Sequence, residues 1–395
     1  MRVLFLTDSL SDLDGVGRYA VRLITALEKA RPGLEVRILL ARKHRPTSAE
    51  VPARWDVSVR LPPDYFFHMS PPRFWTSLAA ASLRVSSAAE GADLVHAIKD
   101  YPHSLAGVLG ARLRGIPCVA TAHGTYSVQP LLSRRHARLA RWTYARLAGL
   151  VSVSRYTRDR LVELAGGTAF ARLRVIPNAV SAEHYAAPSG VGPRAWHAHP
   201  FTLSIGEIKE RKGHHLALAA FARVAPTHPD LHHYVVGKAG GDAYATQLLA
   251  GVRAAGLAER VHFLGNVDES EKIDLLQRAR VFVLTPVQAS DGGFEGFGIV
   301  YLEAAACGRP AIGTRGCGAE DAVVHGVTGL LVEPNEEAVA AALERLLSDE
   351  SFARSLGKAA RQRALQSSWD ANAKSVLALY DEILEAQDAP RAGVA

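Results

Sequence analysis

The chain has 395 residues, of which 48% are hydrophobic and 22% charged, and this composition is typical of folded globular domains. The length suits roughly two or three domains, and the composition excludes a wholly disordered, collagen-like or disulfide-scaffold protein. The formal net charge of +7 comes from residues 1–190, which hold 26 Lys and Arg against 14 Asp and Glu. This basic first half indicates an anionic partner for that part of the chain.

Short apolar runs alternate with longer Ala- and Leu-rich segments along the first half of the chain. The runs predicted as strands are 3–7, 36–40, 93–97, 118–122, 150–153 and 174–176. Helical spacing of apolar residues is clear between them, for example in 16–31 and 139–147. This alternation predicts a parallel sheet with helices on both faces.

A Pro-, Gly- and His-rich stretch, residues 188–200, separates this set of elements from a second one. Strands are predicted there at 201–205, 233–236, 261–264, 281–284, 311–313 and 330–332. We therefore predict an α/β protein with two Rossmann-like parallel-sheet domains, 1–190 and 200–368, that face each other across a cleft. Because open α/β sheets bind ligands beyond the carboxyl ends of their strands, the residues that follow each strand are the candidate site residues.

The cysteines and the apolar segments bear on the compartment. Cys118, Cys307 and Cys317 are odd in number and form no Cys-x-x-Cys pair, which argues against a disulfide framework. The first apolar run is too short for a signal-peptide core, and no stretch reaches the ~18 apolar residues of a spanning helix. We therefore expect a cytoplasmic protein, with a peripheral position on the inner face of the membrane left open.

The strongest candidate site is the segment 295–303, in which Glu295 and Glu303 flank Gly296, Phe297 and Gly298. Eight helical residues span about 12 Å, so the two carboxylates could face opposite ends of one ligand. The glycines let backbone amides approach, and a helix N-terminus favours a phosphate. The pattern indicates a diphosphate ligand; the alternative is an ordinary amphipathic helix whose first acid offsets the helix dipole.

A second candidate is the loop 206–213, Gly-Glu-Ile-Lys-Glu-Arg-Lys-Gly, which follows a predicted strand. Arg211 and Lys212 suit a diphosphate, the arginine as a fork and the lysine as a point charge. Taken alone, the loop fits a solvated charged segment at least equally well.

A third candidate is the segment 14–20, Asp-Gly-Val-Gly-Arg-Tyr-Ala, which matches the dinucleotide pattern Gly-x-Gly-x-x-Ala at Gly15 and Gly17. Gly15 lies eight residues beyond Thr7, and Ala-Arg-Lys at 41–43 stands where an acid is expected. The segment is a weak nicotinamide signal and a better glycine loop that opens a helix. The neighbouring Asp12-Leu13-Asp14 has the form of a metal-binding Asp-x-Asp, although a turn is its commoner role.

A fourth candidate is His123, which follows a predicted strand in Thr121-Ala122-His123. A neutral imidazole there could donate to a sugar hydroxyl or a carbonyl, although a lone histidine is more often structural. The other histidines lack an accompanying cluster with ligand spacing, so no metal is expected.

Residues 131–150 form a predicted basic helix that also carries Trp142 and Tyr144. Such a helix could lie on an anionic bilayer, and a plain solvated helix explains it about equally well. Because no helix–turn–helix, zinc-finger or aromatic RNA-binding pattern accompanies the basic charge, nucleic acid is not an expected partner.

The order of these segments resembles glycosyltransferase family 4, retaining enzymes with the two-domain GT-B fold. The matching segments run along nearly the whole chain: 15–17, 121–123, 151–154, 175–180, 206–213, 261–265, 295–303 and 307–310. The resemblance implies transfer of a hexose from a nucleotide-diphosphate sugar to a hydroxyl of a glycan or lipid-linked acceptor. The two candidate sugars are mannose and glucose, and the transfer needs neither a metal ion nor a cofactor. The same resemblance implies an acceptor-binding first domain, to which a terminal segment of about 370–395 crosses back, and a nucleotide-sugar-binding second domain.

The resemblance also implies roles for residues of the second domain. Glu303 resembles the ligand of the donor ribose hydroxyls, and Glu295 the residue that holds the transferred sugar with the amides of Phe297 and Gly298. Lys212 matches the lysine on the donor diphosphate, where it stabilises the leaving group while the acceptor attacks from the same face.

In the first domain, His123 resembles the histidine near the reacting centre, and Gly15 and Gly17 fall where this domain touches the donor phosphate or the acceptor. The family usually has a glycine where Asp14 stands, so this sequence departs from the family pattern on the acceptor side.

One further departure keeps other functions open. Glu207 stands where the family has an arginine, so Arg211 or Lys209 must supply the second cation on the diphosphate. The alternatives are a non-catalytic sugar-nucleotide-binding protein on the same fold, suggested by the missing arginine, and an NAD(P)-dependent oxidoreductase, suggested by the glycine pattern.

Overall fold

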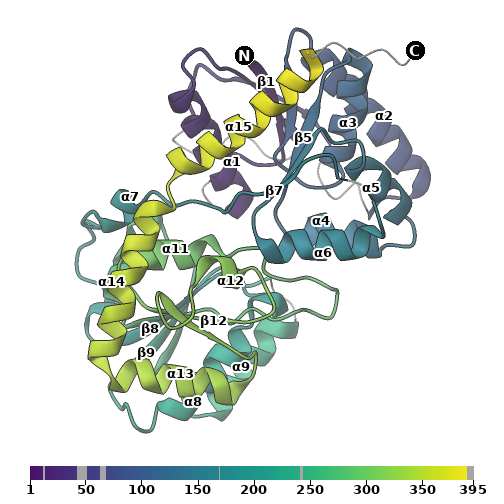
Figure 1. Ribbon diagram of the computed structural model, residues 1–395. Coiled ribbons are helices and arrows are strands. Elements are labelled where there is room, and N and C mark those ends of the chain that lie inside the picture. Colours follow the sequence, from purple (N-terminus) through teal and green to yellow (C-terminus); the bar gives the residue numbers. More distant parts are fainter. Residues whose placement is uncertain (12–13, 42–50, 63–67, 169, 241–242, 389–395) are drawn as a thin grey trace. The chain divides into compact units, whose positions relative to one another are not determined.

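The computed structural model describes residues 1–11, 14–41, 51–62, 68–168, 170–240 and 243–388 (Figure 1). The chain divides into two compact units. Unit 1 comprises Met1–Asn178 with the C-terminal segment from Trp369, and unit 2 is Ala179–Ser368. The predicted linker 188–200 therefore lies inside unit 2, and the chain passes between the units at 178/179 and 368/369.

Unit 1 contains a sheet of seven parallel strands in its described part, in the order β3-β2-β1-β4-β5-β6-β7. The strands are β1 (Arg2–Thr7), β2 (Glu35–Ala41), β3 (Asp56–Leu61), β4 (Leu94–Ala97), β5 (Cys118–Ala122), β6 (Gly149–Ser152) and β7 (Leu173–Val175). The helices include α1 (Gly15–Ala30), α2 (Pro71–Ala88), α3 (His103–Arg114), α4 (Thr125–Leu132), α5 (Ala137–Tyr144), α6 (Arg155–Ala165) and α15 (Trp369–Asp388).

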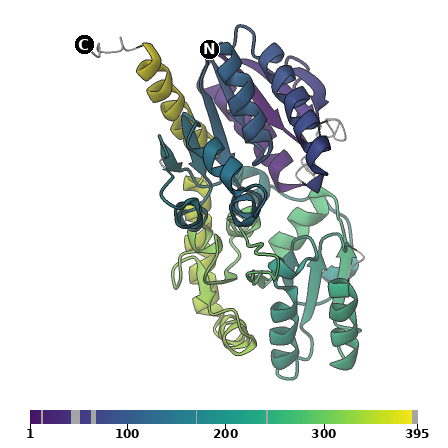
Figure 2. The same cartoon turned by 90° about the vertical axis from the view of Figure 1, so that its right-hand side faces the viewer.

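Helices cover both faces of this sheet (Figure 2). Val3 and Phe5 of β1 belong to one core with α1 and α15, whereas Leu6 contacts α3 at Gly107, as the alternation of side chains along a strand requires. The C-terminal helix α15 contributes the fully buried Tyr380 to the core that contains Val3 and Phe5. This helix is therefore an integral part of unit 1.

The structure differs from the expectations for the first half at two points: one strand was missed, and one predicted helix is broken. The edge strand β3 was not predicted, although its sequence Asp-Val-Ser-Val-Arg-Leu alternates polar and apolar residues as a half-buried strand does. The predicted basic helix 131–150 is not continuous. Pro130 lies in the last turn of α4, Ser133 is extended, and the segment resumes as α5 before it ends in the buried strand β6.

Unit 2 contains six parallel strands in its described part, in the order β10-β9-β8-β11-β12-β13. The strands are β8 (Phe201–Ile205), β9 (His232–Val236), β10 (Val261–Gly265), β11 (Val281–Val283), β12 (Ala311–Thr314) and β13 (Gly329–Val332). The helices include α7 (Ala182–Ala186), α8 (His214–Val224), α9 (Ala243–Ala254), α10 (Glu269–Arg278), α11 (Ile299–Ala306), α12 (Ala319–Ala322), α13 (Glu336–Ser348) and α14 (Glu350–Gln366). The six predicted strands of the second half all occur.

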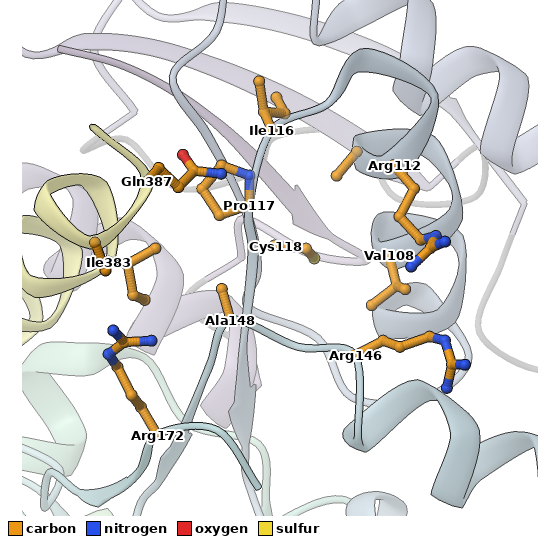
Figure 3. Close-up of a pocket in the computed structure, with 12 residues that line it drawn as sticks. Val108, Arg112, Ile116, Pro117, Cys118, Arg146, Ala148, Arg172, Ile383 and Gln387 are labelled. Atoms are coloured by element: carbon orange, nitrogen blue, oxygen red, sulfur yellow. The ribbon is translucent and has the colours of Figure 1, made fainter. Parts of the chain in front are cut away.

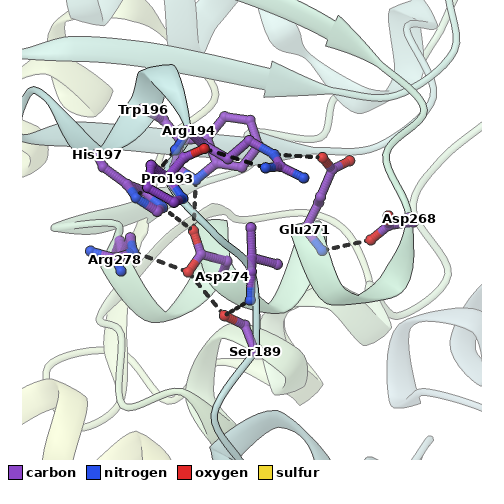
Figure 4. A network of polar contacts seen from close by, with 10 residues as sticks. Ser189, Pro193, Arg194, Trp196, His197, Asp268, Glu271, Asp274 and Arg278 are labelled. Atoms are coloured by element: carbon purple, nitrogen blue, oxygen red, sulfur yellow. Dashed lines mark hydrogen bonds and ion pairs between the residues drawn. The ribbon is translucent and has the colours of Figure 1, made fainter.

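Within unit 2, Asp274 holds the segment 188–200 against α10 through hydrogen bonds (Figure 4). Its carboxylate is 2% exposed and accepts from Trp196 Nε1 and His197 Nε2 at 2.7 Å each, and from Ser189 Oγ and Arg278 Nε at 3.0 Å each. Burial opposes ionisation, but these donors outweigh it and lower the pKa of Asp274 to about 2.

Replacing Asp274 with Asn is expected to lower the free energy of unfolding by about 2–3 kcal/mol at pH 7, because four donors lose a charged acceptor. Since the pKa is lower in the folded state, this contribution is complete above about pH 5 and is lost as the pH falls towards 2. Urea unfolding at pH 7, 5 and 3 should therefore show the two proteins converging. Glu271→Gln, on the same helix, is the control, and an equal gap between wild type and Asp274→Asn at every pH would contradict the assignment.

Candidate active site

Two of the predicted segments meet at the carboxyl edge of the sheet in unit 2. The loop after β8 carries Arg211 and Lys212, and the loop after the neighbouring strand β11 leads to Glu295. Lys212 Nζ donates a hydrogen bond to Glu295 Oε2, and Arg211 Nη1 lies 3.6 Å from the same oxygen. The backbone N–H of Val287 donates to the carbonyl of Arg211 at 3.1 Å and ties the loops together. Two cations and one carboxylate thus form a compact cluster.

The charges of this cluster follow from burial and pairing. Glu295 is 7% exposed; burial favours its neutral form, but Lys212 and Arg211 outweigh burial and lower the pKa of Glu295. Burial lowers the pKa of Lys212, while the attraction of Glu295 opposes that shift. The carboxylate also accepts from the backbone amide of Phe297, so Glu295 is held from both sides.

Glycines shape the backbone around the cluster. Gly213 has φ +66°, and a Cβ there would lie 1.7 Å from the carbonyl oxygen of Thr285. Gly298, the N-cap residue of α11, has φ +81°, and a Cβ there would lie 2.7 Å from the ring of Tyr301. A Cβ on Gly318 would come within 2.0 Å of the Gly296 carbonyl oxygen. Gly318 was not predicted as a site residue, although the pattern Gly-Cys-Gly at 316–318 was a possible signal.

Glu303, the second acid of the motif, lies on α11 and is 3% exposed. Its Oε2 is 3.4 Å from Nζ of Lys272, a buried lysine on α10 that was not predicted. A signal existed, because Lys272 precedes Leu275, Leu276 and Ala279 at the spacing of an apolar helix face. Each acid of the motif therefore has a lysine beside it.

Glu207 stands where the family has an arginine, and the two cations near it, Lys209 and Arg211, pair with different carboxylates. Lys209 pairs with Glu207 at 2.9 Å, and both side chains are exposed. Arg211 instead turns towards Glu295. Of the two candidates for the second cation, Arg211 is the one that joins the cluster.

In unit 1, His123 follows β5 at the carboxyl edge of that sheet. Its Nε2–H donates to the carbonyl of Ile98 at 2.8 Å, and its backbone N–H donates to Asp100 Oδ1 at 3.0 Å. Burial lowers the pKa of His123, so the neutral ring carries its single proton on Nε2 and Nδ1 is an acceptor. The ring can therefore accept from a ligand through Nδ1, whereas the sequence suggested a donor.

A buried ion pair near His123 was also missed. Lys99, which follows β4, lies 3.0 Å from Asp8, which follows β1, and both side chains are nearly inaccessible. Their position directly after strands was the available signal, but no motif contains them.

Asp14, the N-cap residue of α1, organises the glycine loop. Its carboxylate accepts from the Gly17 N–H at 2.7 Å and from Ser9 Oγ at 2.5 Å. A Cβ on Gly17 would lie 2.5 Å from the Ser11 carbonyl oxygen, whereas nothing lies within 4 Å at Gly15. Asp12 and Leu13, of the suggested Asp-x-Asp pattern, lie outside the described residues, and no group of three metal-ligating side chains occurs among those described.

A hollow of about 270 Å³ lies in unit 1 at the amino ends of the strands, opposite to the carboxyl ends where His123 lies (Figure 3). Cys118 at the start of β5 and Ile383 of α15 line it, with Arg112 from the last turn of α3. Arginines near helix C-termini offset the negative end of the helix dipole. Because the hollow lies at the amino ends of the strands, it is separate from the predicted site.

None of the helices in the described part of the chain is long and apolar enough to cross a membrane.

In the comparison with known proteins, each half of the chain matches a glycosyltransferase family model. Residues 195–363 match the model described as "Glycosyl transferases group 1", and residues 13–184 match "Glycosyltransferase Family 4". Glycogen synthase of Mycobacterium tuberculosis is 31% identical over 278 residues, 69% of this chain and 64% of that protein. The GDP-mannose-dependent alpha-(1-6)-phosphatidylinositol monomannoside mannosyltransferase of Mycolicibacterium smegmatis is 31% identical over 281 residues, 67% of this chain and 69% of that protein.

The fold agrees with these matches. The crystal structure of Anabaena Alr3699/HepE in complex with UDP and glucose has a TM-score of 0.79 at 20% identity and covers 97% of this chain and 100% of that chain. The predicted GT-B fold, with two parallel-sheet α/β domains, is thereby confirmed. The chain belongs to glycosyltransferase family 4.

Proposed function

We propose that the protein is a retaining glycosyltransferase that moves a hexose from a nucleotide-diphosphate sugar to a hydroxyl of a glycan or a lipid-linked acceptor. The observation that carries the proposal is the cluster of Lys212, Arg211 and Glu295 beside the glycine-rich start of α11. Relatives point the same way: one is named as GDP-mannose-dependent, and one similar structure contains UDP and glucose. The sugar is accordingly proposed to be mannose or glucose.

In this proposal Lys212 and Arg211 neutralise the donor diphosphate, so the step needs no metal ion and no cofactor. As the bond from the sugar to the diphosphate loosens, the departing oxygen gains negative charge, and the two cations stabilise it. Amides at the start of α11 add to this stabilisation because the helix N-terminus attracts anions.

Glu295 holds the transferred sugar by accepting from its hydroxyls. The carboxylate is already engaged by Lys212 and by the amide of Phe297, which favours a fixed hydrogen-bond acceptor over a nucleophile. Retention then arises when the acceptor hydroxyl attacks from the face that the diphosphate leaves and gives its proton to the departing phosphate. Glu303 accepts from the ribose hydroxyls, and His123 accepts from the sugar or acceptor through Nδ1.

A thermal-shift panel of nucleotide sugars tests the proposal, with GDP-mannose and UDP-glucose as first members and NADH and NADPH as contrasts. A bound donor raises the melting temperature by mass action, and its turnover is then measured as released nucleoside diphosphate. Stabilisation by a nucleotide sugar with turnover supports a transferase. Stabilisation without any turnover, even hydrolysis, favours the non-catalytic alternative, and stabilisation by NADH or NADPH alone favours the oxidoreductase.

We also propose that unit 1 contacts an anionic membrane surface. Trp75 on α2 and Leu132 on α4 are about half exposed, and Arg135 lies over the ring of Phe74 at 5.7 Å. His136 packs on the same ring at 4.9 Å, so aromatic, aliphatic and basic side chains gather near one end of α2. Such a mixture suits the headgroup region of an anionic bilayer.

Co-sedimentation with vesicles is expected to increase as phosphatidylglycerol replaces phosphatidylcholine, and to weaken in the double variant Trp75→Ser/Leu132→Ser. Leu249→Ser, which alters an exposed leucine on α9 of unit 2, is the matched control and should bind as wild type. Binding that ignores the anionic lipid fraction would rule out this surface.

A further inference from the structure

Lys272 is a lysine in a position where a helix normally buries an apolar side chain. It lies on α10 and is 6% exposed. Burying an ammonium costs several kcal/mol unless opposite charges and hydrogen bonds compensate. Its contacts should therefore reveal why the charge is kept there.

The ammonium of Lys272 sits between two carboxylates. Nζ lies 2.8 Å from Glu269 Oε2 and 3.4 Å from Glu303 Oε2, and it donates to Tyr185 Oη at 2.8 Å. Tyr185 Oη in turn donates to Glu269 Oε1 at 2.9 Å. Glu269 is half exposed and Tyr185 is buried, so one side of the ammonium is anchored and the other side faces the buried Glu303.

The outer anchor is itself well defined. Burial raises the pKa of Glu269, but Lys272 and the Tyr185 hydroxyl outweigh burial and lower it. A lysine held only for this contact would need no approach to α11. Its proximity to the second acid of the motif indicates a task at Glu303.

We propose that Lys272 is a positioning residue for the donor: it keeps the Glu303 carboxylate ionised and fixed so that it accepts from the ribose hydroxyls. This inference rests on the proposed function, and no motif of the sequence contains Lys272. An ionised carboxylate offers about four lone-pair sites, so pairing with one ammonium is compatible with accepting from a diol. Because the ribose contact is made in the bound donor and in the transition state alike, it contributes to donor KM rather than to kcat.

The test compares the donor selected by the panel with its 2′-deoxyribose counterpart. Lys272→Met is expected to raise the KM for the ribose donor about tenfold and to leave kcat within about threefold, as suits the weakening of a charged hydrogen bond. The preference for the ribose donor should shrink at the same time. Since both residues act on one contact, the double variant Lys272→Met/Glu303→Ala should have no higher donor KM than Glu303→Ala alone.

Two further variants keep the test decisive. Arg278→Met removes a different cation from α10, and it should retain the wild-type KM and ribose preference. If Lys272→Met does not fold, Tyr185→Phe decides, because it removes one anchor of the ammonium and keeps the ring; it should raise the donor KM and reduce the ribose preference.

The outcomes also separate this inference from the function on which it rests. An unchanged ribose preference in folded Lys272→Met, or in Tyr185→Phe where that variant decides, overturns the inference, as do losses that add up in the double variant. If Glu303→Ala alters the ribose preference while these variants do not, the proposed function stands and only the role of Lys272 falls. If wild type binds no nucleoside diphosphate in calorimetry and turns over no donor, the proposed function itself fails.

Discussion

Replacing Lys212 with Met is expected to lower kcat/KM for sugar transfer by about 10²- to 10³-fold in a protein that remains folded. The ammonium of Lys212 is buried beside Glu295, where charges interact more strongly than in water. Its removal withdraws positive charge from the departing diphosphate. Arg211, whose Nη1 lies 3.6 Å from Glu295 Oε2, is then the cation that stays beside Glu295. Steady-state kinetics with the selected donor, together with a thermal melt, measure the effect.

The pH profile adds a second readout for Lys212. Because burial lowers the pKa of this lysine, the activity of wild type should decline at a lower alkaline pH than an ordinary lysine would give. That decline should be absent from the residual activity of Lys212→Met. Lys209→Met, which removes an exposed lysine of the same loop, should change the rate by less than about twofold. Full activity in Lys212→Met would exclude the proposed role.

Replacing Gly213 with Ala is expected to lower the free energy of unfolding by about 2–5 kcal/mol. The φ of +66° disfavours any side chain, and the added Cβ would lie 1.7 Å from the Thr285 carbonyl oxygen, so the backbone must move. The movement displaces Lys212 as well, and transfer activity should fall with stability. Urea unfolding and the transfer assay measure the two losses.

Gly251→Ala is the matched control for that experiment. Gly251 lies in α9 of the same unit, and nothing lies within 4 Å of its added Cβ. Because alanine favours a helix over glycine, this variant should gain about 1 kcal/mol. Equal stability of Gly213→Ala and Gly251→Ala would show that the close approach to Thr285 is not rigid.

The cluster of Lys212, Arg211 and Glu295 could be anticipated because its segments follow strands, and the carboxyl ends of parallel strands share one edge of a sheet. β8 and β11 prove to be neighbours, which brings residues 83 positions apart into contact. The edge strand β3 and the break between α4 and α5 were missed because they depend on weak local signals.

Polar residues inside the packing could not be assigned from the sequence. Lys272 and Asp274 sit two residues apart on α10, and each has a partner on another element that the sequence does not reveal: Glu303 on α11 for Lys272, and Trp196 in the segment before β8 for Asp274. The tautomer of His123 likewise depends on the carbonyl of Ile98, 25 residues earlier. Such pairings arise from tertiary packing, which no local pattern encodes.

The double passage of the chain between the units has a consequence for biosynthesis. The sheet of unit 1 is covered on one face by α15, whose residues reach the ribosome's exit only after all of unit 2 has been made. Translation of residues 179–368 takes roughly 10–40 s at about 5–20 residues per second. During that interval the apolar face around Val3 and Phe5 lacks its last helix, so part of the core of the first unit stays uncovered until α15 has been made.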